Sequence, residues 1–82
     1  MIQARKFVKE MIELQERKQR ELDRRGKRSN ELLRKSDEAY SVEQWEAYHA
    51  CIEHQQNKMM KLIHDLFVIR HILETVDLQQ GD

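Results

Sequence analysis

The sequence predicts an all-α fold, an antiparallel, coiled-coil-like hairpin of two long helices. Proline is absent, glycine occurs only at positions 26 and 81, and 37% of the residues are charged. This composition is typical of long helices, because glycine and proline are the residues that a helix interior tolerates least. An apolar heptad pattern in the second half of the chain, and a capping signal before it, place the two helices.

The second helix is expected over residues 41–78, followed by a frayed tail at 79–82. Apolar side chains recur there at alternating spacings of three and four residues, which is the period of a coiled-coil seam. Gln55 is the one polar member, and a lone polar seam residue often fixes the register. The ten seam positions are Trp45, Tyr48, Ile52, Gln55, Met59, Leu62, Leu66, Ile69, Leu73 and Val76.

The first helix is expected over residues 2–37. Residues 2–14 carry a broad apolar face, whereas residues 15–30 are mostly polar and charged. Gly26 lies in the polar part, and glycine costs about 1 kcal/mol relative to alanine inside a helix. We therefore expect a weak point at Gly26, either a kink or, as the alternative, a break at residues 25–29.

The turn between the helices is expected at residues 37–41. Ser41 starts a Ser-Val-Glu-Gln sequence, which has the form of a capping box with Gln44 as its second polar member. Tyr40, just before the cap, is expected to pack on Trp45 as a hydrophobic staple. The chain then forms a single helical-hairpin domain of 82 residues.

A short connection makes the two helices antiparallel neighbours, so residue i is expected opposite roughly residue 79 − i. Residues 2–14 then face residues 65–77, apolar against apolar, and the charged stretch 15–31 faces residues 48–64. Both helices are thus polar in the middle and apolar at the open end of the hairpin. This agreement between two independently read segments favours the hairpin.

The hairpin alone is expected to leave several large apolar side chains in water, above all Met60, Phe67, Val68 and Ile72. Burying four such side chains is worth roughly 6–10 kcal/mol, which approaches the whole stability of a small domain. The sequence therefore predicts a homodimer in which two hairpins pack by their open ends into a four-helix bundle. A helix of a different protein is the alternative occupant of the same surface. The residues expected to form this partner or dimer interface are Phe7, Met11, Ile12, Met60, Ile63, Leu66, Phe67, Ile69, Ile72 and Leu73.

The expected function is non-enzymatic binding of another protein, as a regulator, adaptor or chaperone of the inhibitor or anti-activator type. The chain has no glycine-rich phosphate loop and no nucleophile elbow, and a narrow hairpin seldom supplies a concave pocket. We therefore expect no enzymatic activity, no cofactor and no small-molecule substrate. In general architecture the chain is similar to small export chaperones, anti-activators and phage-encoded inhibitors, a similarity of fold class that does not fix function.

Nucleic-acid binding is the main alternative, because basic residues crowd one segment of the first helix. Residues 1–35 hold twelve Lys/Arg and six Asp/Glu, a net charge of +6, whereas residues 36–82 hold three and nine, a net charge of −6. Attraction between the two helices explains this asymmetry most simply, and acidic residues interrupt the basic segment, which contains no aromatic side chain. The residues that would contact phosphates are Arg17, Lys18, Arg20, Arg24, Arg25, Lys27 and Arg28.

No metal site is expected, although His49, Cys51, Glu53, His54, His64 and His71 all fall on the second helix. Helical metal ligands need spacings of three or four residues with closing ligands nearby, whereas His64 and His71 lie about 10 Å apart along a helix. Cys51 is the only cysteine, which fits a reducing compartment. No apolar run is long enough to span a bilayer and no signal peptide is recognisable, so we expect a cytoplasmic protein that does not enter the membrane.

Overall fold

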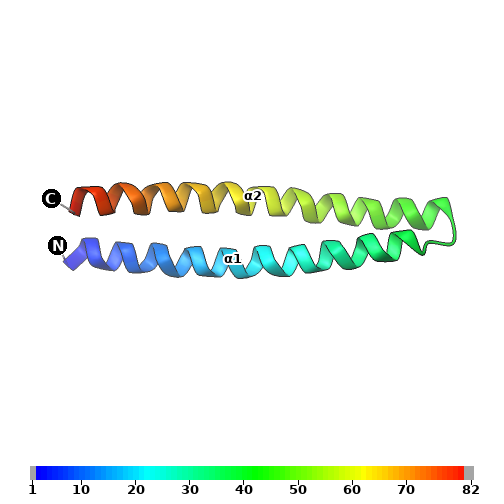
Figure 1. The fold of residues 1–82 in the computed structure, drawn as a ribbon, viewed down its shortest axis with the longest axis horizontal. Coiled ribbons are helices and arrows are strands. Elements are labelled where there is room, and N and C mark those ends of the chain that lie inside the picture. The colour runs from blue at the N-terminus through cyan, green and yellow to red at the C-terminus, as the bar shows by residue number, and fades with distance from the viewer. Residues whose placement is uncertain (1, 81–82) are drawn as a thin grey trace.

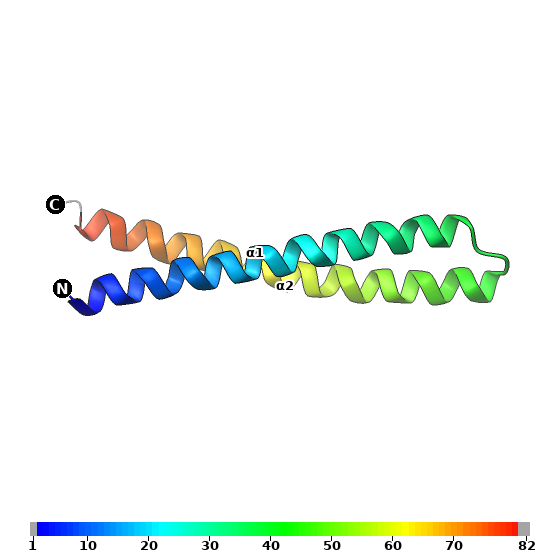
Figure 2. The same ribbon diagram turned by 90° about the horizontal axis from the view of Figure 1, so that it is seen from below.

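The computed structural model describes the backbone of residues 2–80 and the side chains of residues 5–76. Two helices, α1 (Ile2–Asp37) and α2 (Val42–Gln80), are joined by residues 38–41 and run antiparallel, so that both ends of the chain lie together (Figure 1). In the view turned by 90°, the two helices cross near their midpoints, as helices that wind around each other do (Figure 2). The predicted all-α antiparallel hairpin is thus confirmed.

The hairpin is long and thin. Its extents are 61 × 14 × 14 Å and its radius of gyration is 18.4 Å, whereas a compact chain of this length has a radius of gyration of about 12 Å. The buried apolar core is correspondingly small and consists of Leu32, Ile52, Leu62 and Ile69 among the described side chains.

The seam of α2 follows the predicted heptad positions. Nine of the ten predicted residues are buried or half-buried between the helices. Trp45 departs from the pattern, because 46% of it remains exposed. Its ring lies against His49, with ring centroids 3.8 Å apart and an interplanar angle of 32°. The alternation of three and four residues therefore places the inner face of α2 over most of its length.

The seam of α1 is more polar than the seam of α2. Its buried and half-buried positions continue from the apolar end with the same heptad spacing, through the charged middle of the helix to the turn. They are Val8, Met11, Gln15, Lys18, Leu22, Arg25, Ser29, Leu32 and Ser36. The small side chains of Ser29 and Ser36 are 6% and 3% exposed, and the Ser36 hydroxyl donates a hydrogen bond to the carbonyl of Leu33 at 2.7 Å.

Helix α1 continues without interruption through Gly26, as the range 2–37 predicts, so the alternative of a break at residues 25–29 is wrong. Gly26 has no positive φ angle. It lies at the helix–helix contact, where a Cβ atom would stand 3.7 Å from the Cε atom of Met59. This distance is an ordinary van der Waals contact, so the packing at Gly26 leaves room for a Cβ atom and the position does not require glycine.

The N-terminus of α2 is capped by Ser41, as the sequence indicates. The backbone N–H of Gln44 donates to the Ser41 hydroxyl oxygen at 3.1 Å, and the side-chain carbonyl of Gln44 accepts from the backbone N–H of Tyr40 at 2.8 Å. Two otherwise free backbone donors are satisfied in this way. The predicted staple is wrong, because Tyr40 is 96% exposed and does not pack on Trp45.

The register differs somewhat from the expected pairing of i with 79 − i. The Lys18 ammonium lies 3.0 Å from the Asp65 carboxylate, whereas the simple rule would place residue 61 opposite Lys18. Side chains on an α-helix lean toward its N-terminus. In an antiparallel pair the leans of both helices add, so that a given residue of α1 meets a residue of α2 with a higher number than the simple rule gives. At the C-terminal end, Gln79 and Gln80 belong to α2, although both were expected in the frayed tail, whose last residues 81–82 lie outside the described part.

Candidate functional site

Three large apolar side chains form an exposed line along the middle of α2. Met60 is 68% exposed, Ile63 is 54% exposed and Phe67 is 71% exposed. Their spacings of three and four residues place them on one face of the helix, directly beside the seam residues Met59 and Leu62. We call Met60, Ile63 and Phe67 the α2 stripe.

The remaining residues of the predicted interface divide between the hairpin core and its flanks. Phe7, Ile12 and Val68 are 41%, 42% and 40% exposed. Ile69 is only 5% exposed, because it packs inside the hairpin and leaves almost no surface for a partner. Ile72, which was expected in water, is half-buried, as are the other predicted interface residues Met11, Leu66 and Leu73.

Three of the exposed apolar residues, Phe7, Ile12 and Ile63, can be assigned to the two flanks of the hairpin. The seam residues come in pairs three residues apart, such as Met59 and Leu62. In an antiparallel hairpin, the residue directly after each such pair lies on one flank, and the residue directly before it lies on the other flank. Ile63 and Ile12 belong to the first flank, together with the contact between Gly26 and Met59. Phe7 belongs to the second flank, with the ion pair of Lys18 and Asp65.

The basic cluster of α1 is divided by the fold into two parts. Lys18 donates to the Asp65 carboxylate at 3.0 Å. Arg25 donates from Nη1 to the Gln55 side chain at 3.0 Å, and from Nε and Nη2 to Glu21 at 3.2 and 3.1 Å. These two basic residues therefore join α1 to α2 and face inward.

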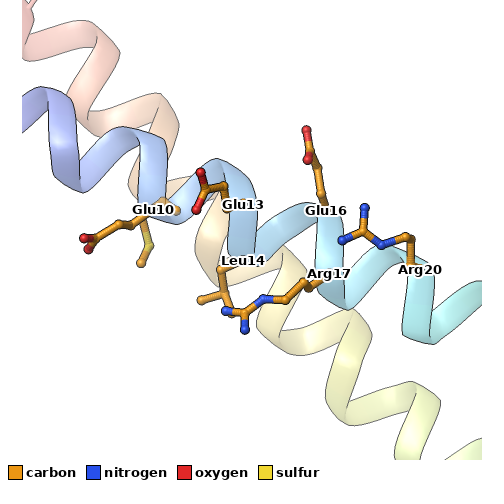
Figure 3. Close-up of a pocket in the computed structure, with 7 residues that line it drawn as sticks. Glu10, Glu13, Leu14, Glu16, Arg17 and Arg20 are labelled. Carbon is orange, nitrogen blue, oxygen red and sulfur yellow. The ribbon is translucent and has the colours of Figure 1, made fainter.

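The other basic residues of the cluster, Arg17, Arg20, Arg24, Lys27 and Arg28, are exposed. Arg17, Arg20, Arg24 and Lys27 line a shallow groove along α1 that also includes Glu21 and Asp23. Figure 3 shows Glu10, Glu13 and Glu16 on the same stretch of α1 as Arg17 and Arg20, with the Glu10 carboxylate directed away from those of Glu13 and Glu16. This surface is charged with both signs, and its carboxylates do not converge on a common point.

The hydrogen bond that Asp65 accepts from Lys18 holds the pKa of the Asp65 carboxyl below its ordinary value of 3.8. Partial burial opposes this effect, and the charges of Lys18 and His64 add to it. Side-chain exposure is 26% for Lys18 and 46% for Asp65, so solvent screens the pair. Its main contribution is therefore to select the register in which the two helices meet.

The candidate metal ligands of α2 do not assemble. His54, His64, His71 and Cys51 are exposed along the helix, and His49 packs against Trp45. Among the residues that the structure describes, no group of three or more His, Cys, Asp or Glu side chains is placed to hold a metal ion. Within the same residues, neither helix combines the length and the apolar character that a membrane span requires.

Comparisons with protein-family models, curated proteins and solved structures find no match. The residues available for an inference about function are thus the α2 stripe and the exposed basic residues of α1. The stripe follows from sequence periodicity, because all three of its members were expected in the interface. The inward positions of Lys18 and Arg25 were missed, although the heptad spacing of α1, followed without regard to polarity, runs through both.

Proposed function

We propose that this protein is a non-enzymatic protein-binding module that acts as a regulator, adaptor or chaperone of the inhibitor type. The observation that carries the proposal is the exposure of Phe67, at 71%, next to the similarly exposed Met60 and Ile63 on the same face of α2. Contiguous apolar surface on a small protein marks a site of interaction. Methionine adds adaptability to such a site, because its flexible side chain can repack against different partners.

The free energy available at the α2 stripe is large relative to the stability of a small domain. Complete burial of a large apolar side chain is worth about 1.5–3 kcal/mol, so burying the exposed fractions of the three residues is worth roughly 3–6 kcal/mol. Small domains are stable by about 5–15 kcal/mol in total. A partner that covers the stripe therefore contributes a substantial part of the stability of the assembly.

The shape of the hairpin supports self-association. Its accessible surface is 6925 Å², whereas a compact monomer of this mass exposes about 5,200 Å². Two hairpins that pack side by side would cover part of this excess and convert the pair of helices into a four-helix bundle. We propose that the protein forms such a homodimer, and that binding to another protein uses the same apolar surface.

Replacement of Phe67 by aspartate tests the proposal. Phe67→Asp places a charge in the stripe, so we expect it to shift the light-scattering mass to that of one chain, 10.0 kDa, while the far-ultraviolet spectrum stays helical. Tyr40→Asp is the matched control, because it makes the same kind of change at a 96% exposed residue in the turn. An unchanged mass for Phe67→Asp would count against the proposal.

Nucleic-acid binding is the second candidate function, favoured by the exposed line of Arg17, Arg20, Arg24 and Lys27. The double variant Arg20→Glu/Arg24→Glu removes positive charge there and leaves the inward-facing Lys18 and Arg25 in place. If the line binds phosphates, a gel shift at low salt should detect binding by the wild type and its loss in this variant. No shift for the wild type at low salt would remove this candidate.

We also propose that the protein works in the cytoplasm. Cys51 is free and exposed. An exposed thiol persists in the reduced form in compartments that contain thiol reductants, of which the cytosol is the main one. The proposal predicts that Cys51 reacts fully with a maleimide in freshly lysed cells.

A further inference from the structure

The α2 stripe continues at both ends into a line of exposed polar residues. The spacing of four and three residues extends it to Gln56 and Glu53 toward the turn, and to Arg70 and Glu74 toward the open end. The complete line is Glu53, Gln56, Met60, Ile63, Phe67, Arg70 and Glu74, and all seven residues are exposed. It covers about 30 Å of the helix at 1.5 Å per residue.

This line has nearly the same character in both directions from Ile63. Met60 and Phe67 flank Ile63 as large apolar side chains, a polar or charged long side chain follows on each side, and a glutamate stands at each end. A twofold-symmetric interface brings the same patch of both subunits together, so the patch must be complementary to itself. An unrelated partner protein imposes no such requirement on the order of the residues.

We propose that the line is covered by a second copy of this chain, with the two α2 helices antiparallel across a twofold axis at Ile63. In this arrangement Ile63 meets Ile63 of the second copy, and Met60 meets Phe67 of the second copy. The inference rests on the proposed function, to which it adds the identity of the partner and its orientation.

The charges of the line select the antiparallel arrangement over the parallel one. Parallel helices in register would place Arg70 against Arg70 and each glutamate against its own copy. In the antiparallel pair, Arg70 lies beside Gln56 of the second copy, and Glu53 of the second copy is about one helical turn away, within reach of a long side chain. Within its own chain, the Arg70 Nε–H donates to the Glu74 carboxylate at 3.1 Å. Each end of the interface thus holds one arginine between carboxylates of both chains, which favours this orientation.

Cysteine cross-linking at Ile63 tests the position of the twofold axis. Helix axes pack about 8–10 Å apart and Cα atoms lie about 2.3 Å from the helix axis, so Cα atoms that face each other at the twofold axis are roughly 3.5–5.5 Å apart, a range whose upper part overlaps that of disulfide bonds. In a Cys51→Ser background, Ile63→Cys should form a covalent dimer under mild oxidation. Lys61→Cys in the same background is the control, because Lys61 is exposed and a separation of two residues places it on the opposite side of the helix from Ile63.

Charge exchange tests the orientation independently. Glu53→Arg alone and Arg70→Glu alone each create like-charge contacts, so each should raise the dimer dissociation constant, on the order of tenfold. The double variant Glu53→Arg/Arg70→Glu restores the opposite charges and should recover most of the wild-type affinity. The affinity of the double variant is compared with that of Arg70→Glu. Both variants lack the contact of Arg70 with Glu74, so a difference between their dimer dissociation constants comes from residue 53.

The outcomes separate this inference from the proposed function. Selective cross-linking of Ile63→Cys, together with rescue by the double variant, supports the antiparallel pair. A wild-type dimer in which Lys61→Cys cross-links as well as Ile63→Cys, or in which the double variant is no better than the single ones, overturns this arrangement but leaves self-association intact. A wild type that stays monomeric in sedimentation experiments overturns both the arrangement and the proposed homodimer, and the stripe then belongs to a different protein.

Discussion

Lys18 and Asp65 form the one ion pair between α1 and α2 among the described side chains. Lysine occupies a seam position of α1, where its aliphatic chain packs between the helices and its ammonium group reaches the edge. The pair is partly exposed, so its effect on stability is modest. Its electrostatic effect is nevertheless visible in the lowered pKa of Asp65, which makes the contribution of the pair measurable through pH.

The stability of the hairpin should depend on Asp65 at acidic pH. Asp65 has a pKa near 3.8 in the unfolded chain and a lower pKa in the folded chain. The unfolded chain therefore takes up the proton first, so the contribution of the pair is complete above pH 3.8 and is lost as the pH falls through the folded pKa. Urea midpoints measured on both sides of that value should show a smaller acid loss for Asp65→Asn than for the wild type. Glu13→Gln, at an exposed carboxylate of α1, is the control, and equal acid losses for all three proteins would contradict the account.

Gly26 is the residue at which a conservative change should stabilise the hairpin. Alanine is about 1 kcal/mol better than glycine inside a helix, and the added Cβ would meet Met59 at 3.7 Å, an ordinary van der Waals contact. We therefore expect Gly26→Ala to raise the free energy of unfolding by up to about 1 kcal/mol, measured by urea denaturation. Ala50→Gly, at an exposed position of α2, is the reverse control and should lower it by a similar amount. A less stable Gly26→Ala would mean that the helices are closer at this point than described.

At the scale of the helices, the inner face of α2 was predictable and that of α1 was not. The seam of α2 is apolar at nearly every position, so hydrophobic periodicity identifies it directly. On α1 the same spacing passes through Gln15, Lys18 and Arg25, which a search for apolar residues does not register. Lys18 and Arg25 reach the contact by burying their aliphatic stems, and their charged ends donate hydrogen bonds to Asp65 and Gln55 of α2.

The candidate interface shows the same limit. Met60, Ile63 and Phe67 were recognised because the seam of α2 leaves them unburied. Ile69 and Ile72 were assigned to the same surface but lie in or near the contact with α1. Sequence periodicity gives the angular position of a residue on its own helix, whereas its burial also depends on how the other helix crosses it.

The start of α2 provides a prediction at this scale. Ser41 accepts a hydrogen bond from the backbone of Gln44, and removal of such a cap costs about 1 kcal/mol. Ser41→Ala should therefore lower the free energy of unfolding by about that amount in chemical denaturation. Asn57→Ala, at an exposed site within α2, should change it little or raise it slightly. If both substitutions have the same effect, the cap does not stabilise the start of the helix.

At the scale of the whole molecule, two helices of more than thirty residues share a core in which four apolar side chains are buried among those of residues 5–76. Each helix has one neighbour, so most of its circumference faces water. The outer face of α1 suits this environment because it is charged, whereas the middle of α2 carries Met60, Ile63 and Phe67. The conflict between an apolar helix face and an open hairpin is resolved when a second copy covers that face.

The molar mass of the wild-type protein in solution tests this claim most directly. Sedimentation equilibrium over a range of concentrations should give twice the 10.0 kDa of one chain at the upper end of the range. The same samples should show dissociation on dilution, as expected for an interface formed mainly by one helix from each chain. A fully helical protein that keeps the mass of a single chain at every concentration, with Phe67 in solvent, would contradict the account.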